Sequence, residues 1–136
     1  MKLSNIGFLY QFFAPITALE HDEWEYGDVD PTSDDSLRTF IRAALIPSFD
    51  RFDRKGKEVL KDTLRFKLSQ KEFNFNGFWE GTLPLFCLHS RARRFFELLW
   101  ECLFPNEEFQ PVDPTEYVEV DDVNAALRHL GSDQAI

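Results

Sequence analysis

The sequence predicts a mainly α-helical fold, in which residues 1–136 form one domain built as an irregular bundle of about five helices. Three observations support this prediction. Apolar residues recur at helical spacing in several segments, glycine and proline fall at the ends of those segments, and no regular alternation of strand and helix patterns is present. A chain of 136 residues, of which 43% are hydrophobic, is also long enough to bury an ordinary core.

The first predicted helix lies within residues 1–21, where apolar side chains with helical spacing are interrupted by polar ones. The spaced apolar residues are Ile6, Leu9, Tyr10 and Phe13. This pattern favours an amphipathic helix of the mature fold over a cleaved signal peptide, so we expect a cytoplasmic protein. No apolar run approaches the roughly 18 residues that a membrane-spanning helix needs, and no membrane association is expected.

The second predicted helix is SLRTFIRAALI, residues 36–46. Its apolar residues recur three and four positions apart and would form one face of the helix. These residues are Leu37, Phe40, Ile41, Ala44 and Leu45. Ser33, Asp34 and Asp35 stand where side-chain oxygens can cap the free N–H groups of the first turn. Pro47 is expected to end the helix.

The third predicted helix is RKGKEVLKDTLRFKLSQ, residues 54–70, with one apolar and one charged face. After it, Phe73 and Phe75 alternate with asparagines, a period of two residues that fits a short strand or an aromatic-anchored loop. Residues 72–76 and 116–120 are therefore candidates for a small β pair.

The strongest helical pattern is SRARRFFELLWECLF, residues 90–104. Its polar residues form one narrow stripe and apolar side chains cover nearly all of the remaining surface, so we expect this helix to be central in the bundle. The last predicted helix lies in DDVNAALRHLG, residues 121–131, and is expected to end at Gly131. Its inward-facing residues are expected to be Val123, Ala126, Leu127 and Leu130.

The sequence contains no recognisable catalytic or metal-binding motif. The histidines His21, His89 and His129 are isolated from one another and show no zinc-ligand spacing. No glycine-rich phosphate loop and no G-x-S-x-G elbow are present. Cys87 and Cys102 lie in apolar runs and are expected to be buried thiols. We therefore expect that the protein is not an enzyme and that it uses no metal and no organic cofactor.

Charge is segregated along the chain, whose formal net charge is −9. Residues 36–94 hold 13 basic and six acidic side chains, whereas residues 20–35 hold eight acids and residues 95–127 hold nine, both without a base. This balance excludes direct nucleic-acid binding as the main role, because that role requires a net positive surface. The two acidic blocks would either be solvated surface that complements the protein's own basic helices or form a docking surface for a cationic partner.

Aromatic residues lie among the carboxylates of both acidic blocks and favour a docking surface, because aromatic side chains supply contact area and carboxylates speed the encounter with a basic partner. The alternative is that these aromatic residues pin the loops to the core. The candidate partner-binding residues of the first block are Asp22, Glu23, Trp24, Glu25, Tyr26, Asp28 and Asp30. Those of the second block are Glu107, Glu108, Phe109, Asp113, Glu116, Tyr117 and Glu119.

The two runs EHDEWEYGDVD and NEEFQPVDPTEYVEVDD resemble the acidic, aromatic-studded surfaces of bacterial immunity proteins, in particular those paired with the toxins of contact-dependent growth inhibition. The resemblance implies an inhibitor that docks on a basic toxin domain, often a nuclease, and covers its active site with acidic and aromatic side chains. Trp24 and Tyr26 would be anchors. The second block would lie close to the first or extend the same face.

Two other functions fit the same composition. The first is a phage-type inhibitor that mimics nucleic acid, such as an anti-restriction or anti-CRISPR protein, and it would require carboxylates at about phosphate spacing. The second is a small enzyme whose acidic site is assembled from distant residues, and it would require a deep pocket with convergent carboxylates and a histidine.

Overall fold

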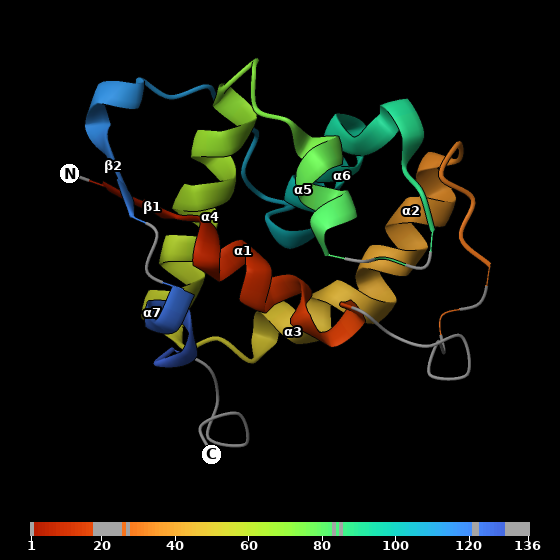
Figure 1. The fold of residues 1–136 in the computed structure, drawn as a ribbon, viewed down its shortest axis with the longest axis horizontal. Coiled ribbons are helices and arrows are strands. Elements are labelled where there is room, and N and C mark those ends of the chain that lie inside the picture. Colours follow the sequence, from red (N-terminus) through yellow and green to blue (C-terminus); the bar gives the residue numbers. More distant parts are fainter. Residues whose placement is uncertain are drawn as a thin grey trace.

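The computed structural model describes residues 2–17, 26, 28–82, 84, 86–120 and 123–129, which form a mainly helical fold with one small sheet (Figure 1). The prediction of fold class is confirmed. The strands are β1 (Lys2–Asn5) and β2 (Tyr117–Val120). The helices are α1 (Ile6–Phe13), α2 (Asp34–Phe40), α3 (Ile46–Asp50), α4 (Arg54–Ser69), α5 (Phe75–Gly81), α6 (Ala92–Leu103) and α7 (Val123–Leu127). A π-helical turn spans Ile41–Leu45, and short 3-10 turns span Ala14–Ile16, His89–Arg91 and Pro114–Glu116.

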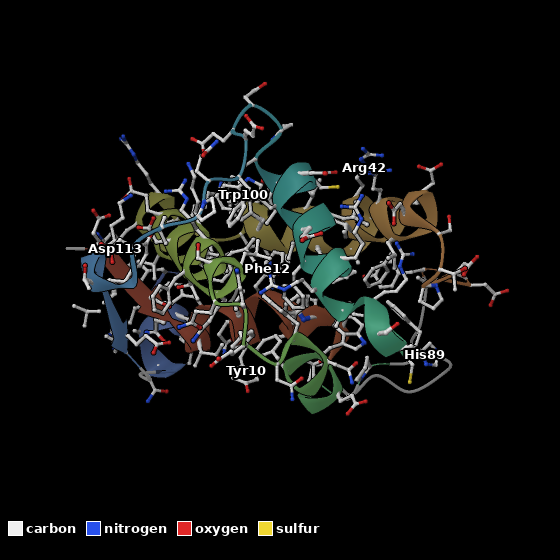
Figure 2. The ribbon with its side chains drawn as sticks, turned by 90° about the horizontal axis from the view of Figure 1, so that it is seen from above. Tyr10, Phe12, Arg42, His89, Trp100 and Asp113 are labelled. Atoms are coloured by element: carbon white, nitrogen blue, oxygen red, sulfur yellow. The ribbon has the colours of Figure 1, made fainter. Side chains whose placement is uncertain are left out.

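Helix α6 is central, as its sequence predicts. It packs against α2, α4 and α5, and its side chains Phe95, Phe96, Leu98 and Leu99 are fully buried. Phe12 of α1 lies in the same core, near the middle of the molecule (Figure 2). Each such side chain contributes roughly 1.5–3 kcal/mol by leaving water, so burial of α6 is a main source of the stability of the fold.

The second predicted helix does not end at Pro47. Helix α2 continues through the π-helical turn Ile41–Leu45 into α3, so one helical rod runs to Asp50. Proline lacks a backbone N–H and its ring crowds the carbonyl four residues earlier, which normally breaks a helix. The wider π-helical turn precedes Pro47 and places it in the first turn of α3, where a missing N–H is tolerated. A local change in helical geometry thus accommodates the proline.

The small sheet has one of its two predicted strands. Residues 117–120 form β2, but β2 pairs in parallel with β1, Lys2 opposite Tyr117, and not with residues 72–76. The latter residues form a turn and the start of α5, where the Asn74 side chain accepts a hydrogen bond from the Gly77 N–H at 2.9 Å. The alternation of phenylalanine and asparagine therefore reflects a helix cap between the half-buried Phe73 and the buried Phe75, not a strand.

The two ends of the described chain pack together. Asn5 caps α1 by accepting a hydrogen bond from the Gly7 N–H at 2.9 Å, so the first predicted helix begins after a strand. Helix α7 contacts α1 and buries Ala126, whereas Leu127 is 42% exposed and does not face inward as predicted. Leu130 and Gly131 lie outside the described residues. In the part of the chain that the structure describes, no helix has the length and apolar character needed to cross a membrane.

Candidate functional site

Residues 105–120, here called the acidic strap, follow α6, pass over α4 and end with β2. Val112 donates its backbone N–H to the Ser69 hydroxyl at the end of α4, at 3.0 Å. Phe109 is half-buried with its ring centroid 5.7 Å from that of Trp100, in an edge-to-face arrangement. Tyr117 is only 8% exposed and stacks on Phe66 at 5.0 Å. Phe109 and Tyr117, the predicted partner-binding aromatic residues of the second block, therefore point into the protein and hold the strap in place, as in the alternative in which they pin the loop to the core.

Two carboxylates of the strap pair with the protein's own lysines. Glu107 forms ion pairs with Lys61 and, at 3.7 Å, with Arg65. The hydrogen bond from Lys61 holds the pKa of Glu107 below its usual value. Glu119 pairs with Lys67. These contacts neutralise charge between the strap and α4. Glu107 and Glu119 therefore complement the protein's own basic helix.

Three other carboxylates of the strap, Glu108, Asp113 and Glu116, are exposed, and none of them pairs with a lysine or arginine of the described chain. Asp113 accepts a hydrogen bond from the Thr115 N–H at 2.9 Å, which lowers the pKa of its carboxyl. It lies at the margin of the molecule (Figure 2). The strap thus carries its aromatic side chains inward and three unpaired negative charges outward.

The first acidic block is described in part. Asp22, Glu23, Trp24 and Glu25 lie outside the described residues. Tyr26 is half-buried and meets Phe40 edge to face at 5.7 Å, so it contacts the core. Asp28 and Asp30 are exposed, and Asp30 accepts hydrogen bonds from the side chain and backbone of Thr32, which lower its pKa.

Asp34 has a role that the sequence did not reveal. Its carboxylate accepts hydrogen bonds from Arg94 Nη2 at 2.8 Å and from Arg91, and these bonds lower the pKa of Asp34 to about 2. Arg91 also donates to the Pro31 carbonyl at 2.9 Å. The pair of arginines therefore ties the end of the first acidic block to the start of α6. The sequence places Asp34 only at a helix start, because its partners lie about sixty residues away.

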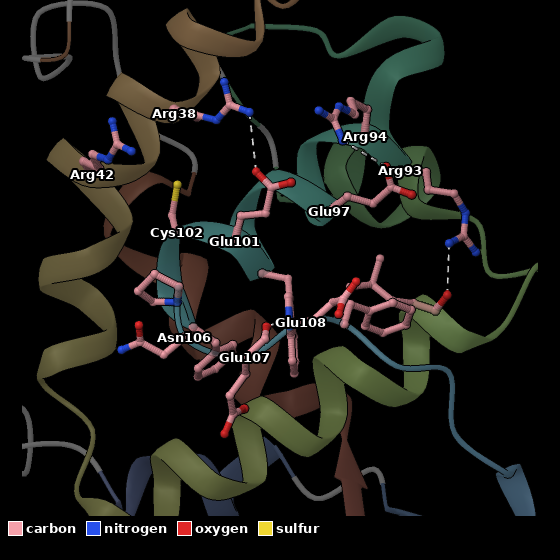
Figure 3. A pocket seen from close by; sticks show the side chains of 15 residues that line it. Arg38, Arg42, Arg93, Arg94, Glu97, Glu101, Cys102, Asn106, Glu107 and Glu108 are labelled. Atoms are coloured by element: carbon pink, nitrogen blue, oxygen red, sulfur yellow. Dashed lines mark hydrogen bonds and ion pairs between the residues drawn. The ribbon is translucent and has the colours of Figure 1, made fainter.

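A pocket of about 660 Å³ opens between α2, α6 and the start of the acidic strap (Figure 3). Its charged lining is largely paired: Arg38 contacts Glu101 at 3.4 Å, and Arg93 donates to the Leu68 carbonyl at 3.0 Å. Arg42 and Glu108 also line it, and neither forms an ion pair within the described residues. Sequence reasoning did not find this pocket, because its lining comes from three separate segments.

The described candidate residues of the two acidic blocks lie at opposite ends of the molecule. In both overall views the residues that precede α2 lie at one end of the molecule and β2 lies at the other (Figures 1 and 2). Of the two expected arrangements, proximity is therefore wrong for the described candidate residues, and extension of one face stays a prediction. Only their inner ends approach, because Arg38 contacts both Asp35 at 3.1 Å and Glu101 at 3.4 Å.

The cysteines differ from expectation as well. Cys87 is an exposed free thiol and Cys102 a half-buried one, whose pKa is raised by burial. Among the described residues no group of three histidine, cysteine, aspartate or glutamate side chains is arranged to hold a metal ion.

Comparison with known proteins gives no relative: no family model, no curated protein and no solved structure matches this chain.

Proposed function

We propose that this protein is an inhibitor of the immunity-protein type, which binds a basic protein partner through its acidic strap and blocks the partner's activity. The observation that carries the proposal is the strap itself. Its backbone is held by Phe109, Tyr117 and the ion pairs with α4, while Glu108, Asp113 and Glu116 face solvent without a cation of their own. Because this backbone is already held in place, it loses little conformational freedom on binding, which favours affinity.

The partner class follows from the charge. A protein whose substrate carries phosphates, such as a nuclease toxin, needs lysines and arginines at its active site. Carboxylates held at a surface attract such a site over distances of about 8–10 Å at physiological salt and raise the association rate. Once docked, the carboxylates form ion pairs with the lysines and arginines that would otherwise bind the substrate. Inhibition then needs no chemistry from this chain, and the proposed place of action is the cytoplasm.

The structure changes which residues are proposed as contacts. Phe109 and Tyr117 support the strap from inside, so in this proposal they act on binding indirectly, through the position of the carboxylates. Glu108, Asp113 and Glu116 are the proposed direct contacts. Asp28 and Asp30, at the other end of the molecule, would meet a partner only if its footprint is wide or if it uses that end alone.

The proposal is tested by inhibition of a captured partner. Basic proteins of the source organism, including the product of a neighbouring reading frame, are bound to the immobilised chain and eluted with a salt gradient. The activity of each recovered protein is then titrated with this chain. We expect stoichiometric inhibition of one basic protein. Recovery of proteins whose activity the chain leaves unchanged would contradict the proposal.

A matched pair of variants localises the inhibitory surface. The strap variant carries Glu108→Lys, Asp113→Lys and Glu116→Lys. The control variant carries Asp50→Lys, Glu58→Lys and Glu72→Lys, three exposed acids outside the strap, and has the same net charge. We expect the strap variant to require at least about tenfold more protein for half-inhibition than the control. Equal potency of the two variants would exclude the strap as the docking surface.

A further inference from the structure

Strand β2 is one of the two edge strands of the small sheet. The sheet has two strands, and β1 occupies one side of β2. In a parallel pair each strand directs only part of its N–H and C=O groups to its neighbour, so an edge strand presents the rest outward. On the outer side of β2, no backbone group of Tyr117–Val120 bonds to any other part of the described chain. The outward backbone N–H and C=O groups of β2 are therefore available to hydrogen-bond an added strand.

The side chains around the edge suit an added strand. Val118 is 42% exposed, which is unusual for a large apolar residue of this protein. At the carboxyl end of the two strands, a hollow of about 460 Å³ lies beside β2. It is lined by Ile6, Lys67, Phe73, Glu119 and Val120. In strand addition, backbone hydrogen bonds supply affinity, and a neighbouring hollow of this kind receives one side chain of the incoming strand.

We propose that an extended segment of the basic partner adds to the sheet at β2. In this segment lysine or arginine alternates with apolar residues. This inference rests on the proposed function and names the binding mode. Asp113 and Glu116 precede β2 and are exposed and unpaired, so they would meet the basic side chains of the segment. The apolar side chains would contact Val118 and the hollow.

Charge selects this occupant over a second copy of the chain. Two copies paired through β2 would bring the exposed, unpaired acids Asp113 and Glu116 of both molecules to one interface. Like charges across a strand pair are destabilising, and acidic residues at an edge are a common means of preventing self-association. A basic segment instead places opposite charges beside Asp113 and Glu116, while Glu119 stays paired with Lys67.

The test uses three synthetic heptapeptides with the intact protein. In the first, lysine alternates with valine. In the second, proline replaces each valine, so the charge is kept while the alternate backbone N–H groups are lost. In the third, glutamate replaces each lysine. Affinity and amide hydrogen exchange are measured by NMR. We expect the lysine–valine peptide to bind at least about tenfold more tightly than either other peptide and to slow exchange within Tyr117–Val120.

Variants separate the edge from general attraction. Glu116→Lys is expected to weaken binding of the lysine–valine peptide several-fold more than Glu108→Lys, because Glu108 lies on the strap away from β2. Equal binding of the lysine–proline peptide, protection of amides elsewhere but not in β2, absence of binding, or dimerisation of the chain through β2 would each overturn the inference.

Failure of this inference is distinguishable from failure of the proposed function. If a basic protein is inhibited by the chain but β2 amides exchange at the same rate in the complex, the inference is wrong and the proposed function stands. If the peptide binds β2 while no basic protein is inhibited, the proposed function is wrong.

Discussion

At the scale of single residues, charge in this protein is divided between internal pairing and outward display. Asp34 and Glu107 are held by arginines and lysines of the chain, whereas Glu108 and Asp113 meet no cation within the described residues. The difference follows from position, because paired acids lie over the basic faces of α4 and α6. Net charge alone therefore overstates the number of carboxylates available to a partner.

The hydrogen bonds of Asp34 with Arg91 and Arg94, here called the Asp34 clamp, make the stability of the fold depend on pH in the acid range. The pKa of Asp34 is lowered from 3.8 to about 2 by the hydrogen bonds from Arg94 and Arg91. A lowered pKa means that the stabilisation is complete above pH 4 and is lost as the pH falls toward 2. In Asp34→Asn, we expect a lower melting temperature at pH 7 and a smaller further decrease between pH 4 and pH 2 than in the parent protein.

The neighbouring carboxylate provides the control for this prediction. Asp35 is almost fully exposed and contacts only Arg38 at 3.1 Å. Asp35→Asn should therefore leave the melting curve and its acid dependence close to those of the parent. If Asp34→Asn and Asp35→Asn changed the melting temperature and its acid dependence equally, the Asp34 clamp would contribute no more to stability than a surface ion pair.

At the scale of elements, a single polar capping residue can determine whether a segment forms a helix or a strand where the spacing of its apolar residues fits both. Phe73 and Phe75 are spaced as in a strand, yet Asn74 between them caps α5. Asn74→Ala is expected to lower the free energy of unfolding by about 1 kcal/mol, the usual cost of losing an N-cap. Chemical denaturation measures this change.

Asn76→Ala is the matched control, since Asn76 lies inside α5 and its side chain donates a hydrogen bond to Glu80 at 3.2 Å without capping the helix. It should cost less than the cap substitution. A larger loss at Asn76 than at Asn74 would contradict the capping role.

The acidic strap is an element without regular structure over most of its length, so its position depends on side-chain anchors. Phe109→Ala removes the contact with Trp100. Because Phe109 is only half-buried, we expect a loss of about 1–2 kcal/mol, less than for a fully buried phenylalanine. Amide exchange in the strap should accelerate more than exchange in α6.

Glu108→Ala, one residue earlier and exposed, is the control and should change neither stability nor exchange. If exchange in the strap were unchanged in Phe109→Ala, the strap would not depend on its aromatic anchor.

At the scale of the whole molecule, the sequence predicts local structure and leaves long-range pairing open. The helical period placed α6 at the centre, because a helix that is apolar on most sides has to be buried. It could not show that β2 pairs with β1, because that pairing joins distant segments. Nor could it show that Pro47 lies within a continuous rod, because the π-helical turn before Pro47 leaves no signal in the apolar spacing.

The candidate site shows the same limit. Composition identified the acidic blocks, but not which carboxylates are paired. The partners of Asp34 and Glu119 lie more than fifty residues away, and no local pattern reveals them. The inward direction of Tyr117 likewise follows from strand register against β1, which fixes the face that each side chain occupies.

The most direct measurement is the association rate of the basic partner with the strap variant (Glu108→Lys, Asp113→Lys, Glu116→Lys) and with its charge-matched control, at low and high salt. The account predicts that the strap variant associates at least about tenfold more slowly than the control at low salt, and that the two rates converge as salt screens the charges. Equal rates for the two variants at every salt concentration would contradict docking through the strap.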